Sequence, residues 1–185
     1  MPRVLIACLV LAAAVAAAPA TASAPSRAKG RDVTVLFGQA LSKVRADPDF
    51  AKAVMLEADG TPNGNKPVDN AGQIASWRFV LDNQRTQGSD FASVTISYRR
   101  SSGFGTPDGN PSPFLDDVQM PKAPKMTLKR AVSLLDKAGF RDGFENVALR
   151  DPLGPDSTAP LYIFGLADNS FVGVNTKTGK VKPLS

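Results

Sequence analysis

The fold is decided by the stretch LYIFGLADNSFVGVNTKTGKV, residues 161–181. Asp168 and Asn169 favour a tight turn between two strand-like segments. A second turn, at Thr178 and Gly179, leads into a short last strand. The stretch therefore predicts an antiparallel hairpin followed by a third strand.

A looser version of the same pattern occurs at residues 77–100. Two segments, 77–82 and 92–99, alternate apolar with polar residues and predict strands with one apolar face. The polar face of the second segment consists of Ser, Thr and Arg. Because such a face suits solvent, we expect an antiparallel sheet that is covered on one side.

Helices are predicted at residues 34–46 and 127–138, where apolar residues recur at helical spacing. Thr34 and Thr127 are placed to cap their N-termini, and Gly139 stands where a left-handed C-cap residue belongs. A short strand is expected after each helix, at residues 53–58 and 145–150.

The order helix, short strand, loop and hairpin occurs twice along the chain. Phe79 in the first hairpin corresponds to Phe164 in the second. We therefore predict an α+β fold of two similar units, each a helix packed on a small antiparallel β-sheet. Trp77 and Phe164 are expected in the core. Chance matching of alternating strands is the competing explanation for the repeat.

The N-terminus has the features of an export signal. Arg3 is followed by an unbroken apolar run and then by small residues, so residues 1–22 are predicted to be a secretory signal peptide. Residues 23–31 read as a disordered leader. The rest divides into a first α+β unit, a Pro/Gly-rich linker or loop and a second α+β unit, at residues 32–100, 101–125 and 126–185. We expect a periplasmic or extracellular protein without stable membrane insertion after signal cleavage.

Composition excludes several enzyme classes. The chain has no histidine, and its one cysteine lies in the predicted signal peptide. Ser-His-Asp and Cys-His hydrolases, and zinc sites built on these residues, are therefore excluded. The formal net charge is +5, but the basic residues are scattered along the chain and form no cluster. This is poor evidence for nucleic-acid binding. We expect no cofactor, no metal and no nucleic-acid partner.

The turn-rich stretch 59–72 is predicted to be a loop. It carries possible calcium ligands at Asp59, Asn63, Asn65 and Asp69. Their spacing does not match an EF-hand loop, and no glutamate closes it. Calcium binding is therefore the minor alternative to a metal-free loop.

The candidate partner-binding segment is the linker or loop at residues 101–125. It is long, and its many prolines and glycines make it irregular. Its apolar residues Phe104, Phe114 and Leu115 either tuck against the sheet or form a recognition surface. Both alternatives stay open at this point.

The second half resembles a PepSY domain. The resemblance rests on MTLKRA at 126–131, LYIF at 161–164 and VNTKTGKV at 174–181. Asn175 departs from the family pattern, which commonly has Asp there. This family occurs in the propeptides of thermolysin-like metallopeptidases and in many exported bacterial proteins, and its proposed role is to bind or restrain peptidases. The resemblance implies such a partner and brings no catalytic residues.

These observations favour an exported, non-enzymatic binding protein. A peptidase inhibitor or regulator is the first candidate, with a secreted or periplasmic protein such as a peptidase as its partner. An envelope or scaffolding domain is the alternative. A carboxylate-based hydrolase is less favoured, because the adjacent Asp116 and Asp117 are expected to point apart as solvated loop charges, and Glu57 and Asp82 stand isolated.

Overall fold

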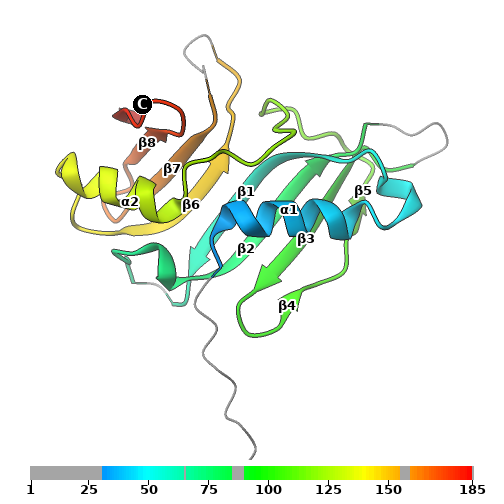
Figure 1. Ribbon diagram of the computed structural model, residues 1–185, viewed down its shortest axis with the longest axis horizontal. Helices are drawn as coiled ribbons and strands as arrows, with labels where there is room; N and C mark the ends of the chain where they lie inside the picture. The colour runs from blue at the N-terminus through cyan, green and yellow to red at the C-terminus, as the bar shows by residue number, and fades with distance from the viewer. Residues whose placement is uncertain (1–30, 65, 85–89, 155–158, 185) are drawn as a thin grey trace, which may run out of the picture.

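The computed structural model describes residues 31–64, 66–84, 90–154 and 159–184. Within them the chain forms one antiparallel sheet of nine strands and two α-helices, which confirms the α+β class (Figure 1). The predicted signal peptide, residues 1–22, lies outside the described residues, and so does the leader up to residue 30.

The first half begins with a helix and ends with two short strands. Its elements are α1 (Val33–Val44), a 3-10 turn (Pro48–Phe50), β1 (Val54–Pro62), a second 3-10 turn (Ala71–Gln73), β2 (Ile74–Asp82), β3 (Ser93–Arg99), β4 (Gly103–Phe104) and β5 (Asp108–Asn110). Those of the second half are α2 (Leu128–Lys137), β6 (Phe144–Arg150), β7 (Leu161–Leu166), β8 (Phe171–Asn175) and β9 (Val181–Leu184).

The strands follow one another outward from the middle of the sheet. Their order is β4-β3-β2-β1-β6-β7-β8-β9, and β5 also pairs with β3. At the centre, residues 57–60 of β1 pair antiparallel with residues 147–150 of β6. The predicted pair of separate small sheets is therefore one continuous sheet. The reason is that each small sheet would leave a bare edge, and these two edges bond to each other.

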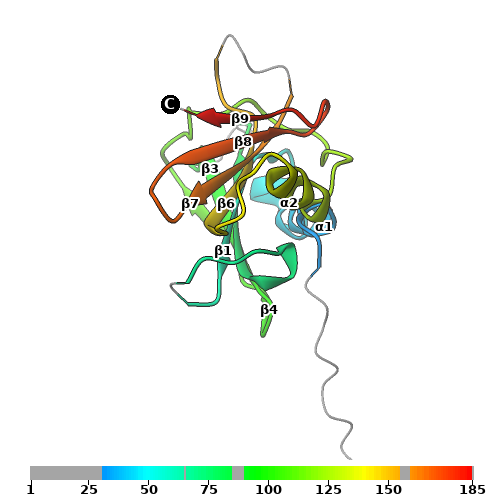
Figure 2. The ribbon, with the colours of Figure 1, turned by 90° about the vertical axis from the view of Figure 1, so that its left-hand side faces the viewer.

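Both helices lie on the same face of the sheet, as Figure 2 shows, and Asp32 ties their N-termini together. Its Oδ1 accepts a hydrogen bond from the Thr34 amide at 3.0 Å and caps α1. Its Oδ2 accepts one from the amide of Leu128, the first residue of α2, at 3.1 Å. The predicted cap, Thr34, is therefore wrong, because the two oxygens of Asp32 satisfy amides at both helix starts.

The second helix begins and ends as predicted. The Thr127 side chain accepts a hydrogen bond from the Arg130 amide, and Gly139 has a φ of 99°, in the left-handed region that ends helices. The buried hydroxyl of Tyr162 donates to the Met126 carbonyl at 2.9 Å. This bond attaches the start of α2 to β7.

One apolar core, drawn from both halves, fills the space between the helices and the sheet. Trp77 and Phe164 are 4% and 0% exposed, which confirms that they are core residues. Phe164 meets Phe144 edge-on, with ring centroids 5.0 Å apart. Shared burial of this kind stabilises two small units better than either could be stabilised alone.

The predicted loop at 59–72 is wrong in its first part, because β1 continues to Pro62. The strand is hydrogen-bonded on both sides, to β2 and to β6, and this pairing overrides its turn-prone sequence. Gly60 is required by packing, since a Cβ there would lie 2.8 Å from the Trp77 ring. The linker at 101–125 also contains regular structure, because β4 and β5 pair with β3.

Replacing Gly60 by Ala is expected to destabilise the fold by about 1–3 kcal/mol, because the added methyl group overpacks against Trp77. Gly38→Ala is the matched control, since an added Cβ in this part of α1 meets nothing within 4 Å. It should stabilise the protein by about 0.5–1 kcal/mol through helix propensity. Urea unfolding followed by the fluorescence of Trp77, the single tryptophan, measures both. Equal stability of Gly60→Ala and wild type would contradict the packing.

Candidate functional site

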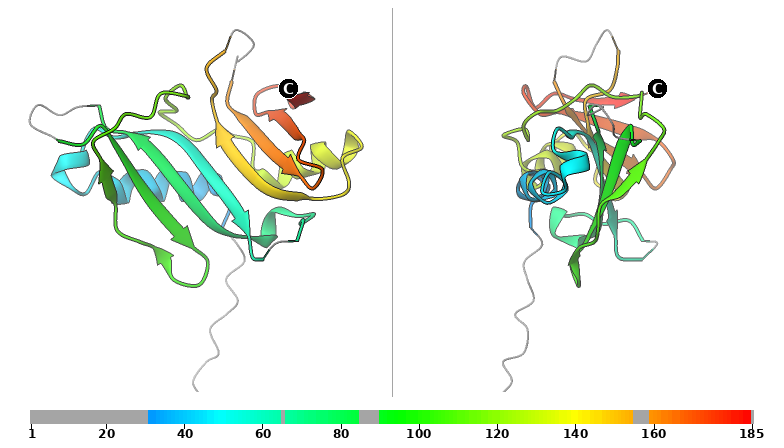
Figure 3. Two further views of the ribbon diagram at one scale, coloured as in Figure 1. Left: turned by 180° about the vertical axis from the view of Figure 1, so that it is seen from behind. Right: turned by 90° about the vertical axis from the view of Figure 1, so that its right-hand side faces the viewer.

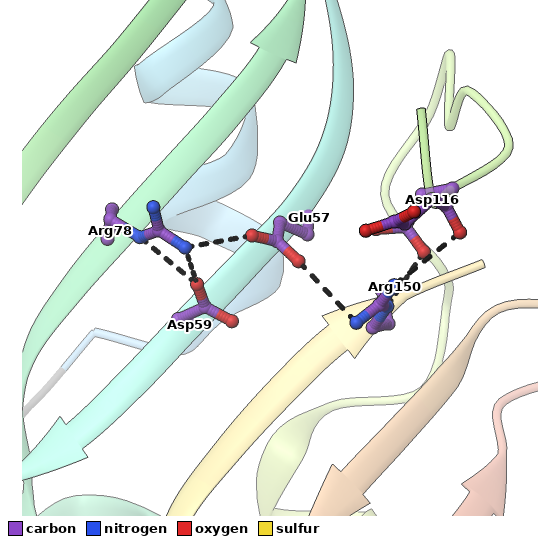
Figure 4. A network of polar contacts seen from close by, with 6 residues as sticks. Glu57, Asp59, Arg78, Asp116 and Arg150 are labelled. Atoms are coloured by element: carbon purple, nitrogen blue, oxygen red, sulfur yellow. Dashed lines mark hydrogen bonds and ion pairs between the residues drawn. The ribbon is translucent and has the colours of Figure 1, made fainter. Parts of the chain in front are cut away.

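The left view of Figure 3 shows the face of the sheet opposite the helices, with the strands toward the viewer. At its centre, where β1 lies between β2 and β6, charged side chains of both signs meet (Figure 4). We define the charge network as Glu57, Asp59, Arg78, Asp117 and Arg150.

Strand register brings four members of the charge network together. Asp59 is paired with Arg78 on β2, and Glu57 is paired with Arg150 on β6. Arg78 Nη2 lies 3.0 Å from Glu57 Oε1 and 2.7 Å from Asp59 Oδ2. Arg150 Nη1 is 3.9 Å from the other Glu57 oxygen. Glu57 is thus held between two guanidinium groups, one from each half of the sheet.

The fifth member comes from residues 111–127, which join β5 to α2 and which we call the crossing segment. The Val118 amide donates to the Asp151 carbonyl, and the Met120 amide donates to a carbonyl of β1, both at 2.7 Å. These bonds fasten the crossing segment to β1 and to the end of β6. Arg150 Nε consequently donates to Asp117 Oδ1 at 2.7 Å.

Burial perturbs two carboxyl groups of the charge network. Glu57 is 3% exposed and Asp117 is 8% exposed. Burial, followed by the nearby Asp59, raises the pKa of Glu57 from 4.5 to about 7, against smaller opposing effects of Arg150 and Arg78. Burial also raises the pKa of Asp117, against the hydrogen bond from Arg150. Glu57 therefore exchanges a proton near neutral pH, where an ordinary glutamate is fully ionised.

Asp117 has hydrogen-bonding capacity to spare. Its Oδ2 is buried and has no hydrogen-bond partner among the described residues. Arg150 Nη2 points instead toward the Asp116 carbonyl, 3.5 Å away. Because a buried carboxylate oxygen without a donor is costly, this atom marks the network as a place where a further donor fits.

The predicted partner-binding residues lie in three different environments. Phe104 belongs to β4, at the edge of the sheet, and packs against the core with its ring centroid 5.0 Å from that of Tyr98. Phe114 is half-buried, and Leu115 is 72% exposed. Phe104 therefore takes part in the fold, whereas Leu115 lies on the surface, within the crossing segment.

Further exposed apolar residues accompany Leu115. Val118 is 44% exposed and Leu153 is 63% exposed. The Leu153 amide donates to the Asp116 carbonyl at 3.3 Å, and an isolated β-bridge joins the same two stretches, so they run side by side. We call Leu115, Val118 and Leu153 the apolar rim. It adjoins Asp117 along the chain.

The prediction that Glu57 stands isolated is wrong, because Arg78 and Arg150 flank it, and one of the two adjacent aspartates is not a solvated loop charge. Asp116 is exposed, as expected of a loop charge, whereas Asp117 is buried against Arg150. The available signal at Glu57 was its place between Leu56 and Ala58 in an otherwise apolar stretch. A charged residue in such a run has to find partners, and these come from distant parts of the chain.

One of the possible calcium ligands, Asp59, is paired with Arg78, and another, Asn65, lies outside the described residues. Within the part of the chain that the structure describes, no group of three or more His, Cys, Asp or Glu residues is placed to hold a metal ion.

Comparison with protein-family models, with curated proteins and with solved structures finds no match. Among the described residues, no helix has the length and apolar character needed to cross a membrane.

The burial of Glu57 predicts that stability falls as the pH rises. The carboxyl group of Glu57 holds its proton up to about pH 7 in the folded state, but only up to about pH 4.5 in the unfolded chain. Its contribution to stability is therefore fully present below pH 4.5 and is lost progressively as the pH rises to about 7 and beyond. Glu57→Gln cannot ionise, and it should reduce the fall in unfolding free energy between pH 5 and 8 by about 2 kcal/mol. Urea unfolding at each pH measures the difference.

Glu145→Gln is the matched control, because it makes the same change at an exposed position of β6. It should leave the pH dependence of stability as it is in the wild type. If the unfolding free energies of the wild type and Glu57→Gln changed in parallel with pH, the pKa of Glu57 would not be raised.

Proposed function

We propose that this chain is an exported, non-enzymatic binding protein, which contacts a protein partner through the open face of its sheet and the apolar rim. A peptidase is the first candidate for the partner, in line with the PepSY resemblance of the second half. The observation that carries the proposal is the charge network, whose Glu57 and Asp117 are buried although they lie on the sheet face opposite both helices of the described residues. We call this face the open face.

A buried ionic cluster is a poor way to stabilise a sheet. Replacing such a cluster by apolar residues of similar size is often neutral or stabilising. The raised pKa of Glu57 means that its two arginines do not offset the effect of its burial. Recognition explains the presence of these charges better than folding does.

The network exposes a residue type that is common at protein interfaces. Arginine is enriched at such interfaces, and a few residues carry most of the binding energy. The Arg78 side chain is 52% exposed in the middle of the open face. Leu115 and Leu153 of the apolar rim are exposed as well.

A hydrolytic role fits the same carboxylates less well. A general acid or base needs an oxygen directed at the substrate. Glu57 has one oxygen bonded to Arg78 and its other oxygen faces Arg150. Both oxygens of Glu57 therefore face guanidinium groups of the protein itself, which supports binding over catalysis at this residue.

We propose further that the two halves are degenerate copies of one helix-and-sheet unit, so that the PepSY resemblance of the second half extends to the first. Each half places a helix before its central strand and adds its later strands outward. The central strands, β1 and β6, pair antiparallel, which is the arrangement that a two-fold relation between equivalent strands produces.

Affinity capture from the proteins secreted by the chain's own source cells tests the binding proposal. The mature chain, residues 23–185, is immobilised, and the captured protein is identified by mass spectrometry. The double variant Leu115→Asp/Leu153→Asp should bind that protein at least ~10-fold more weakly, because charges replace apolar contacts at the rim.

Val35→Asp is the matched control, because Val35 is 52% exposed but belongs to α1, on the covered side of the sheet. It should bind the partner as the wild type does, and thermal unfolding should verify that each variant is folded. Equal binding by the rim variant and the wild type, or capture of no saturable partner, would refute the proposed function.

A further inference from the structure

The charge network holds more negative than positive charge. Its acids are Glu57, Asp59 and Asp117, and its bases are Arg78 and Arg150. When every group is ionised, three carboxylates face two guanidinium groups. One negative charge then has no counterpart within the network.

The network also has too few hydrogen-bond donors for its carboxylate oxygens. Arg150 is divided among Asp117 Oδ1 at 2.7 Å, the Asp116 carbonyl at 3.5 Å and Glu57 Oε2 at 3.9 Å. The Asp117 side chain is 0% exposed, and its Oδ2 has no hydrogen-bond partner among the residues described. An orphaned buried acceptor of this kind indicates a donor that the described residues do not supply.

The network can be reached from the open face. The side chains of Arg78 and Asp59 are 52% and 35% exposed, whereas that of Glu57 is 4% exposed. Asp59 and Glu57 lie two positions apart on β1, so they project from the same face of the sheet. A donor that enters beside Asp59 is therefore directed toward Glu57, where it has to share the two carboxylates with Arg78, whose Nη2 already bridges them at 2.7 and 3.0 Å.

We propose that the charge network binds one basic side chain, an arginine or a lysine, of the protein partner; this inference rests on the proposed function. The incoming cation pairs with Asp59 and Glu57 and balances the charge of the network. Arg150 is then released from Glu57 and can turn both arms of its guanidinium toward Asp117, which supplies a donor to the orphaned Oδ2.

Binding of the cation is coupled to the release of a proton. The charged groups around Glu57 are Asp59 on its own strand, Arg78 on β2, Arg150 on β6 and Asp117 on the crossing segment. Burial raises the pKa of Glu57 to about 7, and a cation beside it lowers that pKa again. A basic ligand should consequently bind about tenfold more tightly at pH 8 than at pH 6.

The probe is the peptide acetyl-Gly-Gly-Arg-Gly-Gly-amide, compared with the same peptide carrying neutral citrulline in place of arginine. Because the chain has a formal net charge of +5, the protein as a whole repels a cationic peptide, and binding at low salt points to a specific acidic site. NMR titration of the mature chain at pH 6 and pH 8, followed through the side-chain Nε–H signals of Arg78 and Arg150, gives both affinity and location.

The arginine peptide should shift both signals saturably and bind about tenfold more tightly at pH 8, whereas the citrulline peptide should not bind. Glu57→Gln should weaken binding and remove its pH dependence, and the control Glu145→Gln should change neither. Should Glu57→Gln fail to fold, Asp59→Asn provides the second test. It alters a partly exposed carboxylate, and it should weaken binding. Because the charge of Asp59 helps to raise the pKa of Glu57, the pH dependence of binding should move to lower pH in this variant.

Equal binding of the citrulline peptide, shifts confined to other residues, or an affinity independent of pH would each overturn the cation site. Those outcomes leave the proposed function standing as long as the rim variant still loses the captured partner. In the converse case, the peptide binds as expected, but the rim variant captures the partner as well as the wild type does. The cation site is then supported and the proposed function fails.

Discussion

The antiparallel pairing of β1 with β6 is the contact on which the rest of the structure depends. It turns two marginal sheets into one, and it gives both helices a common apolar core. The same register places Glu57 opposite Arg150, so the joint between the halves is also where charge is buried. Architecture and candidate site therefore have a single origin.

The arrangement of the helices determines what the other face can do. Asp32 bonds to the N-termini of both helices, and Tyr162 attaches the start of α2 to the sheet. With both helices on one side, alternate residues of every strand are left on the open face. There the crossing segment adds the buried Asp117, which accepts a hydrogen bond from Arg150. The outcome is a charge network that is buried in its middle and open at Arg78 and Asp59.

Local signals in the sequence were enough for the helices and the hairpins, because periodicity, Thr127 and Gly139 act within a few residues of their own position. They failed where a distant partner decides the outcome. Asp32 replaces Thr34 as the cap because it also serves α2, and the turn-prone end of β1 is extended because two strands flank it. The partners of Glu57 were not predicted for the same reason. Its two arginines come from β2 and β6, and only the strand register brings them together.

Glu57 is a buried, incompletely compensated carboxyl group at the joint of the sheet. NMR titration of its side-chain carboxyl carbon, in wild-type protein of residues 23–185 and assigned by the loss of that signal in Glu57→Gln, measures this compensation. A midpoint near pH 7 is expected. A midpoint near the ordinary value of 4.5 would mean that the arginines fully offset the burial, and Glu57 would then be an ordinary ion-paired glutamate.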